Sequence, residues 1–186
     1  MSNPRQPAHP VAPMFVNRWS PRALTGEAIT REQLNTVLEA ARWAPSAFNY
    51  QPWRFIYALR DTAQWGPIFE GVKEGNRTWV KDGSALIVLA SAKNAQFPGR
   101  DAPGPNAWHA FDTGAAWISM ALQASHMGLV AHALAGFDPA VTQREQDGKV
   151  IYRVRVGPYD TKSQAEQIQT QLKSNKFESA LIRVQR

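Results

Sequence analysis

Apolar residues recur every three or four positions between Thr30 and Pro45, a spacing that places them on one face of a helix. The residues with this spacing are Leu34, Val37, Leu38 and Ala41. Thr30 and Gln33 form the pattern of a capping box, in which each side chain bonds the other residue's backbone N–H. The sequence therefore predicts an amphipathic helix that begins after Thr30 and ends at Ala44-Pro45.

From His109 to Met127 the chain is almost entirely apolar or small, and Gly128 follows at the position where a helix usually ends. This pattern predicts a central helix with little polar surface. One of its faces carries Phe111, Ala115, Ile118 and Leu122. Because a single sheet covers only part of such a helix, we expect a homodimer in which a second copy of the chain buries the rest.

Two apolar runs have the length of β-strands, Trp53–Leu59 and Ser84–Ser91. The second is apolar on both faces, which predicts a place in the interior of a sheet. Between them, Trp65–Lys81 is predicted to be helical, and the Pro-Gly and Gly-Pro pairs of Lys93–Asn106 predict a surface loop. The expected fold class is α+β, with a central mixed sheet flanked by helices.

The composition changes along the chain and divides it into three predicted parts. Residues 1–13 contain four prolines without a periodic apolar pattern, which indicates a mobile arm. Residues 14–144 hold the predicted helices and strands described above. Residues 148–186 are rich in Gln and Lys, and predict a β-α-β tail with strands at Val150–Val156 and Ala180–Val184 around a helix capped by Thr161 and Gln164.

Composition narrows the possible chemistry of the 186-residue chain. There is no Cys, which excludes disulfides, thiolate metal sites and a cysteine nucleophile, so redox chemistry would need a cofactor. The net charge is +6, but the basic residues are scattered, so we expect no nucleic-acid partner. No apolar run reaches the length of a membrane span and no leader pattern is present, so we expect a cytoplasmic protein without a membrane partner.

Two segments carry candidate chemistry. Arg18-Trp19-Ser20-Pro21-Arg22 places two guanidinium groups and a hydroxyl within five residues, which suits a phosphate. The stretch Ala44 to Trp53 (APSAFNYQPW) joins a helix to a strand through two prolines and presents polar groups beside aromatic ones. Other chemistries find little support: the four His residues lack metal-ligand spacing, and neither a nucleophile elbow nor a dinucleotide-binding glycine motif occurs.

Together these segments resemble the N-terminal pattern of the nitroreductase family of flavin enzymes. The resemblance continues through the Asn76 region, the Ala85–Ala90 strand, the helix that starts with FDTGAA at Phe111 and the ALAGFD turn at Ala133–Asp138. It implies an FMN-dependent oxidoreductase that takes hydride from NAD(P)H, bound transiently, and passes it to a nitroaromatic, a quinone or a similar small acceptor.

The resemblance also implies cofactor-binding residues. Arg18 and Ser20 would hold the FMN phosphate, and Arg22 would face the N1 and O2 edge of the isoalloxazine, where reduction leaves negative charge. Asn76 matches a side-chain donor to the ring. No residue is implied as a catalytic acid or base, and none as a metal ligand.

A further set of residues is implied at the ring and across the subunit interface. Backbone N–H groups of Ala135 and Gly136 match the turn that contacts flavin N5, where a small residue allows close approach. Ser46 and Asn49 match positions that reach the cofactor from the second subunit. Cofactor binding would then depend on the homodimer.

The nitroreductase pattern stops near residue 140, and the sequence beyond it resembles another family. YRVRVGPY (Tyr152–Tyr159), AEQI (Ala165–Ile168) and LIRV are similar to the second half of a SPOR domain, a module that binds peptidoglycan. The alternative function is therefore a non-catalytic nitroreductase-like scaffold, or a hybrid protein, with a SPOR-like peptidoglycan-binding tail. A tail that only completes or decorates the sheet of the first domain is a further alternative.

Overall fold

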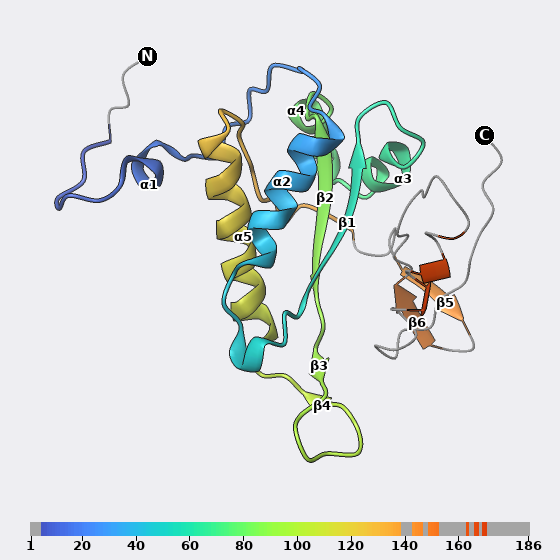
Figure 1. The fold of residues 1–186 in the computed structure, drawn as a ribbon. Coiled ribbons are helices and arrows are strands. Elements are labelled where there is room, and N and C mark those ends of the chain that lie inside the picture. The colour runs from blue at the N-terminus through green and yellow to red at the C-terminus, as the bar shows by residue number, and fades with distance from the viewer. Residues whose placement is uncertain are drawn as a thin grey trace. The chain divides into compact units, whose positions relative to one another are not determined.

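The structure is a computed structural model that describes residues 5–138, 143–146 and 149–152, and single helical residues at 163, 166, 167, 169 and 170. Figure 1 shows the arrangement of these elements. In chain order they are α1 (Pro13–Asn17), α2 (Arg31–Arg42), the 3-10 turn η1 (Ala47–Asn49), β1 (Trp53–Leu59), α3 (Trp65–Glu70), α4 (Glu74–Val80), β2 (Ala85–Ser91), β3 (Asn94–Ala95), β4 (Gly104–Pro105), α5 (His109–His126), β5 (Gln143–Gln146) and β6 (Lys149–Tyr152).

Helix α2 begins where the sequence predicts and ends at Arg42, two residues before Ala44. The Thr30 hydroxyl accepts a hydrogen bond from the Gln33 N–H at 3.0 Å, and the Thr30 N–H donates to the Gln33 side chain at 2.8 Å. Both halves of the capping box are therefore formed, which satisfies two N–H groups that a helix otherwise leaves unpaired. Leu34, Val37 and Ala41 are buried, so the predicted apolar face is the packed one.

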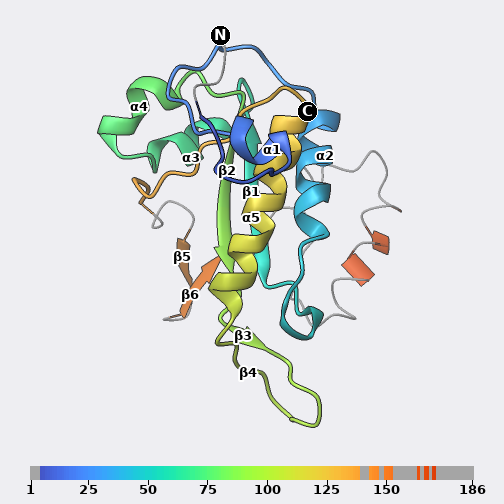
Figure 2. The same cartoon turned by 90° about the vertical axis from the view of Figure 1, so that its left-hand side faces the viewer.

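The core lies between α2, α5 and one face of the β1–β2 pair. Its buried members are Val37, Ala41, Ala44, Trp53, Ala116, Met120 and Ala124. Figure 2 shows α5 lying along the two strands with α2 beside it. Helix α5 runs to His126, and Gly128 takes a φ of +74°, a conformation that glycine adopts without a Cβ penalty, which confirms the predicted helix end.

Strands β1 and β2 form an antiparallel pair in which Trp53 lies opposite Ser91 and Leu59 opposite Ala85. Trp53, Phe55, Ile87 and Leu89 turn to the core. The prediction that the second strand is interior is wrong for the described residues: β2 pairs only with β1 and is half-buried along its whole length. All strand pairs in the described part of the chain are antiparallel. This part therefore contains none of the parallel pairing that a mixed sheet requires.

The single helix predicted over Trp65–Lys81 is two helices, α3 and α4, interrupted after Glu70. The interruption has a tertiary cause, because the segment that follows α5 pairs with it. Val72 bridges Phe137, the Asp138 N–H donates to the Gly71 carbonyl at 2.7 Å, and the Lys73 N–H donates to the Gly136 carbonyl at 2.8 Å. These carbonyls and N–H groups are therefore unavailable to a continuous helical ladder.

The predicted surface loop Lys93–Asn106 contains a short antiparallel hairpin. Asn94 pairs with Pro105 and Ala95 with Gly104, and the loop between them projects beyond the end of the β1–β2 pair (Figure 1). The Arg100 guanidinium lies 5.3 Å from the centre of the Phe97 ring, and the Gln96 amide donates to the Arg100 carbonyl. These contacts close the loop on itself.

Strands β5 and β6 form an antiparallel hairpin near the predicted boundary between domain and tail. Gln143 lies opposite Tyr152 and Gln146 opposite Lys149. The first of these strands was not predicted, and the second agrees with the predicted strand Val150–Val156 as far as Tyr152, where the described residues end. Contacts between residues divide the chain into Met1–Tyr152 and Arg153–Arg186.

Much of the predicted tail lies outside the described residues, including the cap at Thr161 and Gln164 and the strand Ala180–Val184. The five single residues described between 163 and 170 are helical, as the sequence predicts there. In the part of the chain that the structure describes, no helix combines the length and the apolar character needed to cross a bilayer.

Candidate functional site

The segment Arg18 to Arg22 brings a guanidinium and a hydroxyl side by side. Arg18 Nη1 lies 3.5 Å from Ser20 Oγ, and the Arg18 carbonyl accepts a hydrogen bond from Arg5 Nη1 at 3.0 Å. Arg18 is half-buried, whereas Ser20 and Arg22 are exposed. This arrangement places a positively charged hydrogen-bond donor, the Arg18 guanidinium, beside a neutral one, the Ser20 hydroxyl. Phosphate oxygens accept hydrogen bonds from both kinds of donor.

His132 holds this segment against two other parts of the fold. Its Nδ1 lies 2.9 Å from the Pro21 carbonyl oxygen, which makes Nδ1 the donor. Its ring centre lies 4.5 Å from that of Trp79 on α4. The sequence analysis did not select His132, because an isolated His carries no spacing signal, but the structure makes it the link between residues 18–22, α4 and the segment that follows α5.

Asn76 and Gly136, far apart in the sequence, are in contact. The Gly136 carbonyl accepts the Lys73 N–H at 2.8 Å, and the Lys73 carbonyl accepts the Asn76 N–H at the same distance. A Cβ on Gly136 would overlap Asn76 Nδ2, so only glycine leaves this amide in its place. The N–H groups of Ala135 and Gly136 donate to no backbone carbonyl of a described residue. The turn thus presents two donors, beside the Asn76 amide, that no backbone carbonyl of the described residues accepts.

The loop that follows α2 is fixed in an unusual conformation. Phe48, Asn49 and Gln51 all have positive φ angles of 48° to 55°, a region that non-glycine residues rarely occupy. Side chains hold the loop in place. Ser46 Oγ accepts the Gln51 N–H at 3.0 Å, and Asn49 Oδ1 accepts the Gln51 side-chain amide at 3.0 Å. Backbone strain of this kind persists only where the surroundings fix it.

Asp112 ties this loop to the start of α5. Its carboxylate is 3 % exposed and accepts the Ala47 N–H at 3.1 Å. Asp112 was not among the residues expected at the site, and among the described residues no cluster of His, Asp and Glu has the composition of a metal site. Its acidic side chain in the first turn of a buried helix was the available signal.

The candidate residues therefore fall into two groups at opposite ends of α5. The first group, Arg18, Ser20, Arg22, Asn76, Ala135 and Gly136, is anchored around His132, beyond the C-terminal end of the helix. The second, Ser46 and Asn49, is anchored at its N-terminal end by Asp112. An α-helix of 18 residues is about 27 Å long. Figures 1 and 2 both show the loop after α2 at the end of α5 that lies away from α4.

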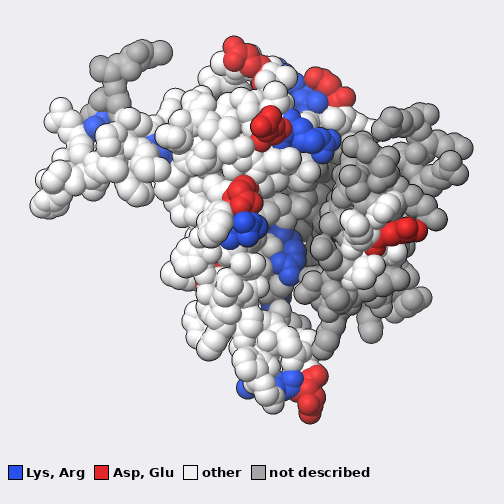
Figure 3. Space-filling model, in the orientation of Figure 1, with Lys and Arg blue, Asp and Glu red and all other residues white. Residues whose placement is uncertain are grey.

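Charge on the described surface is mixed. On the face shown in Figure 3, Lys and Arg side chains stand singly or beside Asp and Glu, without a continuous basic patch.

At the end of α2, hydrogen bonds from Arg42 and Trp43 hold the pKa of the Glu39 carboxyl below its usual value. The Arg42–Glu39 pair is exposed, so it contributes little to stability.

Comparison with known proteins identifies the family. The nitroreductase family model matches residues 16–68, and the SPOR domain model matches residues 121–183. A protein of Streptomyces coelicolor that is named as a NADH dehydrogenase/NAD(P)H nitroreductase is 30% identical over 161 residues, which cover 76% of this chain and 77% of that protein. The chain belongs to the nitroreductase family.

Solved structures of this family share its fold. A crystal structure described as an oxidoreductase containing FMN is 45% identical, with a TM-score of 0.69, over 74% of this chain and 69% of the other. A nitroreductase structure in complex with FMN from Desulfovibrio desulfuricans is 26% identical, with a TM-score of 0.57, over 72% of this chain and 80% of the other. The nitroreductase-like α+β fold predicted from the sequence is thereby confirmed.

The comparisons also confirm the resemblance of the tail to a SPOR domain, with a different boundary. The match starts at residue 121, inside α5, whereas the sequence analysis placed the start at residue 148. The two patterns therefore overlap: α5 packs in the nitroreductase-like core through Met120 and Ala124, and its last residues also lie within the SPOR match.

Proposed function

We propose that the chain is an FMN-dependent oxidoreductase that transfers hydride from NAD(P)H to a small acceptor such as a nitroaromatic or a quinone. One observation carries the proposal: six of the eight residues that the family resemblance assigns to FMN are gathered in one region although they lie far apart in the sequence. His132 joins Pro21 to Trp79 on α4, and α4 also carries Asn76, which touches Gly136. The 45% identity to an FMN-containing oxidoreductase supports the same cofactor.

The donors of this region fit the chemistry of FMN. Arg18 and Ser20 offer charged and neutral donors to phosphate oxygens. The exposed Arg22 would place positive charge near the N1 and O2 edge of the ring, where charge develops, and the N–H groups of Ala135 and Gly136 would donate near N5. Bound FMN would supply two-electron chemistry by accepting a hydride and passing it on. The role of the chain is to bind and orient the ring.

The test is the absorbance spectrum of the purified full chain. A flavin spectrum, with FMN released when the protein is denatured, is the expected result, together with NAD(P)H oxidation that depends on an added nitroaromatic or quinone. A colourless protein that takes up no added FMN would leave the family assignment intact but remove the enzymatic function, in favour of the non-catalytic scaffold.

The contact between Gly136 and Asn76 gives a sharper test of the cofactor site. Gly136→Ala would push the Asn76 amide aside, because the new methyl group occupies its place. Since the displaced group is the end of a side chain, we expect the thermal midpoint to stay nearly unchanged while FMN affinity falls about 10-fold. Gly75→Ala is the control, because a Cβ there meets no atom within 4 Å. Unchanged FMN affinity in Gly136→Ala would place the ring elsewhere.

The proposed enzyme is a homodimer, because one chain separates the two groups of cofactor residues. Ser46 and Asn49 lie at the end of α5 opposite to Gly136, so a second copy would bring them to the cofactor. The outward face of α5 supports such an interface: Phe111 is 81% exposed and Ile118 is 40% exposed, whereas Ala116 and Met120 on the inward face are buried. Exposed apolar side chains along one face of a helix are consistent with a surface that a partner covers.

Phe111→Lys is therefore expected to convert the dimer to a monomer that loses FMN. A charged side chain in the middle of an apolar interface is costly unless it is paired. Sedimentation over a concentration series, followed together with flavin fluorescence, measures both effects. Val11→Lys is a matched control, because Val11 is 49% exposed on the segment before α1. A wild-type chain that stays monomeric at micromolar concentration and keeps its flavin would contradict the dimer.

A second candidate function rests on the SPOR match over residues 121–183. We propose that this part of the chain binds peptidoglycan glycan strands. The test is co-sedimentation of the full chain with purified sacculi, beside a chain that ends at Tyr152, where the contacts divide the molecule. Binding by the full chain alone would support the candidate, and equal binding by both chains would contradict it.

A further inference from the structure

Pro21 is the buried point of the segment Arg18 to Arg22, and its neighbours Ser20 and Arg22 are exposed. The proline ring fixes its own φ and restricts the backbone of Ser20 before it, so few conformations are open to this part of the segment. Proline has no N–H, so its carbonyl is the backbone group by which it is held. That carbonyl accepts a hydrogen bond from His132 Nδ1 at 2.9 Å. The bond therefore fixes the segment between its two exposed side chains.

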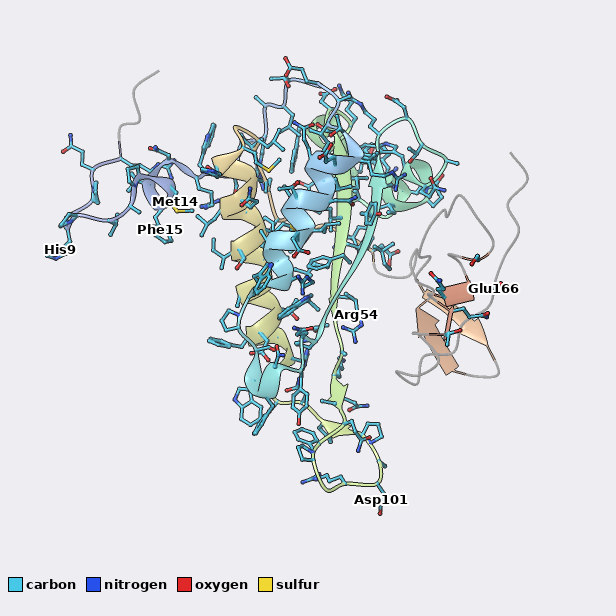
Figure 4. All side chains as sticks on the ribbon, viewed as in Figure 1. His9, Met14, Phe15, Arg54, Asp101 and Glu166 are labelled. Carbon is cyan, nitrogen blue, oxygen red and sulfur yellow. The ribbon has the colours of Figure 1, made fainter. Side chains whose placement is uncertain are left out.

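The helix that precedes this segment, α1, lies at the surface. It ends at Asn17 and contains no buried residue. Met14 is 39% exposed and Phe15 is 56% exposed, and Figure 4 shows both on α1 at the side of α5. Pro21, rather than α1, therefore joins the segment to the packed part of the fold.

His132 is itself held by α4. Its ring centre lies 4.5 Å from that of Trp79, and the two ring planes are inclined by 36°. Trp79 and Asn76 are three positions apart on α4, so their side chains share one face of the helix. Asn76 touches Gly136, which follows His132 in the segment after α5. One face of α4 thus meets that segment at two points, His132 and Gly136.

We propose, on the basis of the function proposed above, that His132 is a positioning residue of the FMN site. Its imidazole connects the segment with Arg18 and Ser20, the proposed phosphate donors, to the helix face with Asn76, the proposed donor to the ring. Groups that are immobilised only when the ligand binds reduce the affinity, because their ordering costs free energy. His132 acts through the backbone of Pro21, which it holds before any cofactor is bound.

Two substitutions of His132 separate its hydrogen bond from its aromatic ring. His132→Phe keeps a ring against Trp79 but has no donor, so the Pro21 carbonyl loses its partner. His132→Asn lacks the ring but offers a side-chain N–H close to the place of Nδ1. We expect FMN affinity to fall about 10-fold in His132→Phe and to stay within about threefold of wild type in His132→Asn, measured by fluorescence titration of the apoprotein. Equal affinity of wild type and His132→Phe would overturn the proposal.

Two control variants exclude other causes. His126→Phe makes the same chemical change at an exposed residue at the end of α5 and should bind FMN as the wild type does. Val37→Ala removes buried atoms from the core, so it should lower the thermal midpoint but leave FMN affinity within about threefold of wild type. If Val37→Ala and His132→Phe lose the same affinity for the same fall in midpoint, His132 supports only the stability of the fold and the positioning role is refuted.

Limited trypsin digestion of the full chain without FMN tests the hold on the segment directly. Trypsin cleaves after Arg18 and Arg22, and cleavage requires the local backbone to open. We expect cleavage at these two sites, identified by mass spectrometry, to be at least about 5-fold faster in His132→Phe than in wild type and to return to the wild-type rate in His132→Asn. Equal cleavage of wild type and His132→Phe would overturn the proposal. A wild-type chain that takes up no FMN would instead refute the proposed function, so the two failures are distinguished.

Discussion

Arg18→Ala is expected to weaken FMN binding about 10- to 150-fold, the cost of losing a charge-assisted hydrogen bond of roughly 1.5 to 3 kcal/mol. The effect should be large because Arg18 would supply the charged donor to the phosphate, and hydrogen bonds that involve a charge are stronger than neutral ones. Arg18 Nη1 lies 3.5 Å from Ser20 Oγ, so without the guanidinium only the neutral donor of this pair remains. Fluorescence titration of the apoprotein with FMN measures the affinity.

Arg31→Ala is the control for this measurement, because Arg31 is an exposed residue of α2 and its loss changes the net charge by the same amount. Its FMN affinity should stay within about twofold of wild type, since charges on exposed residues are screened by salt. If both variants lose affinity equally, the phosphate is attracted by net charge alone, and the contact with Arg18 is refuted.

Asp112→Ala is expected to lower the stability of the fold by about 1 to 3 kcal/mol, because the Ala47 N–H then loses its acceptor in a buried place. In a chain of this size that corresponds to a thermal midpoint about 2 to 12 °C lower. The loop with positive φ angles at Phe48 and Asn49 should also relax, since the bond to Asp112 helps to hold its strained backbone. Thermal unfolding followed by circular dichroism gives the midpoint.

Asp112→Asn separates the hydrogen bond from the rest of the side chain. Asparagine retains an oxygen that accepts the Ala47 N–H, so this variant should lie within about 1 kcal/mol of wild type. If Asn and Ala destabilise the protein equally, the negative charge near the start of α5 matters and the hydrogen bond does not.

The features that the sequence predicts well are those that depend on neighbouring residues. The capping box of Thr30 and Gln33, the apolar run that forms β1 and the glycine that ends α5 all act within a few positions. The break between α3 and α4 could not be predicted in this way. It depends on Phe137 and Asp138, which reach Gly71 and Val72 only after the chain has folded back.

The same distinction applies to the candidate site. Arg18 and Ser20 were selected because they lie two positions apart in the sequence, and the resemblance to a family supplied Asn76 and Gly136, whose contact no local pattern reveals. His132 and Asp112, which anchor the two groups, were missed because each acts on a distant backbone group. Because Ser84–Ser91 is apolar on both faces, the sequence predicted that both faces of this strand would be buried. In the part of the chain that the structure describes, helices of the core pack on one face of the strand.

The composition of the core also bears on how the chain folds during synthesis. Buried residues from α2 pack against buried residues near the end of α5, so the core closes only when both helices have left the ribosome. At about 5 to 20 residues per second, translation from the end of α2 to the end of α5 takes roughly 4 to 17 s. Throughout that interval the apolar strands β1 and β2 lack the helix that covers them, a period in which nascent chains with such strands recruit chaperones or aggregate.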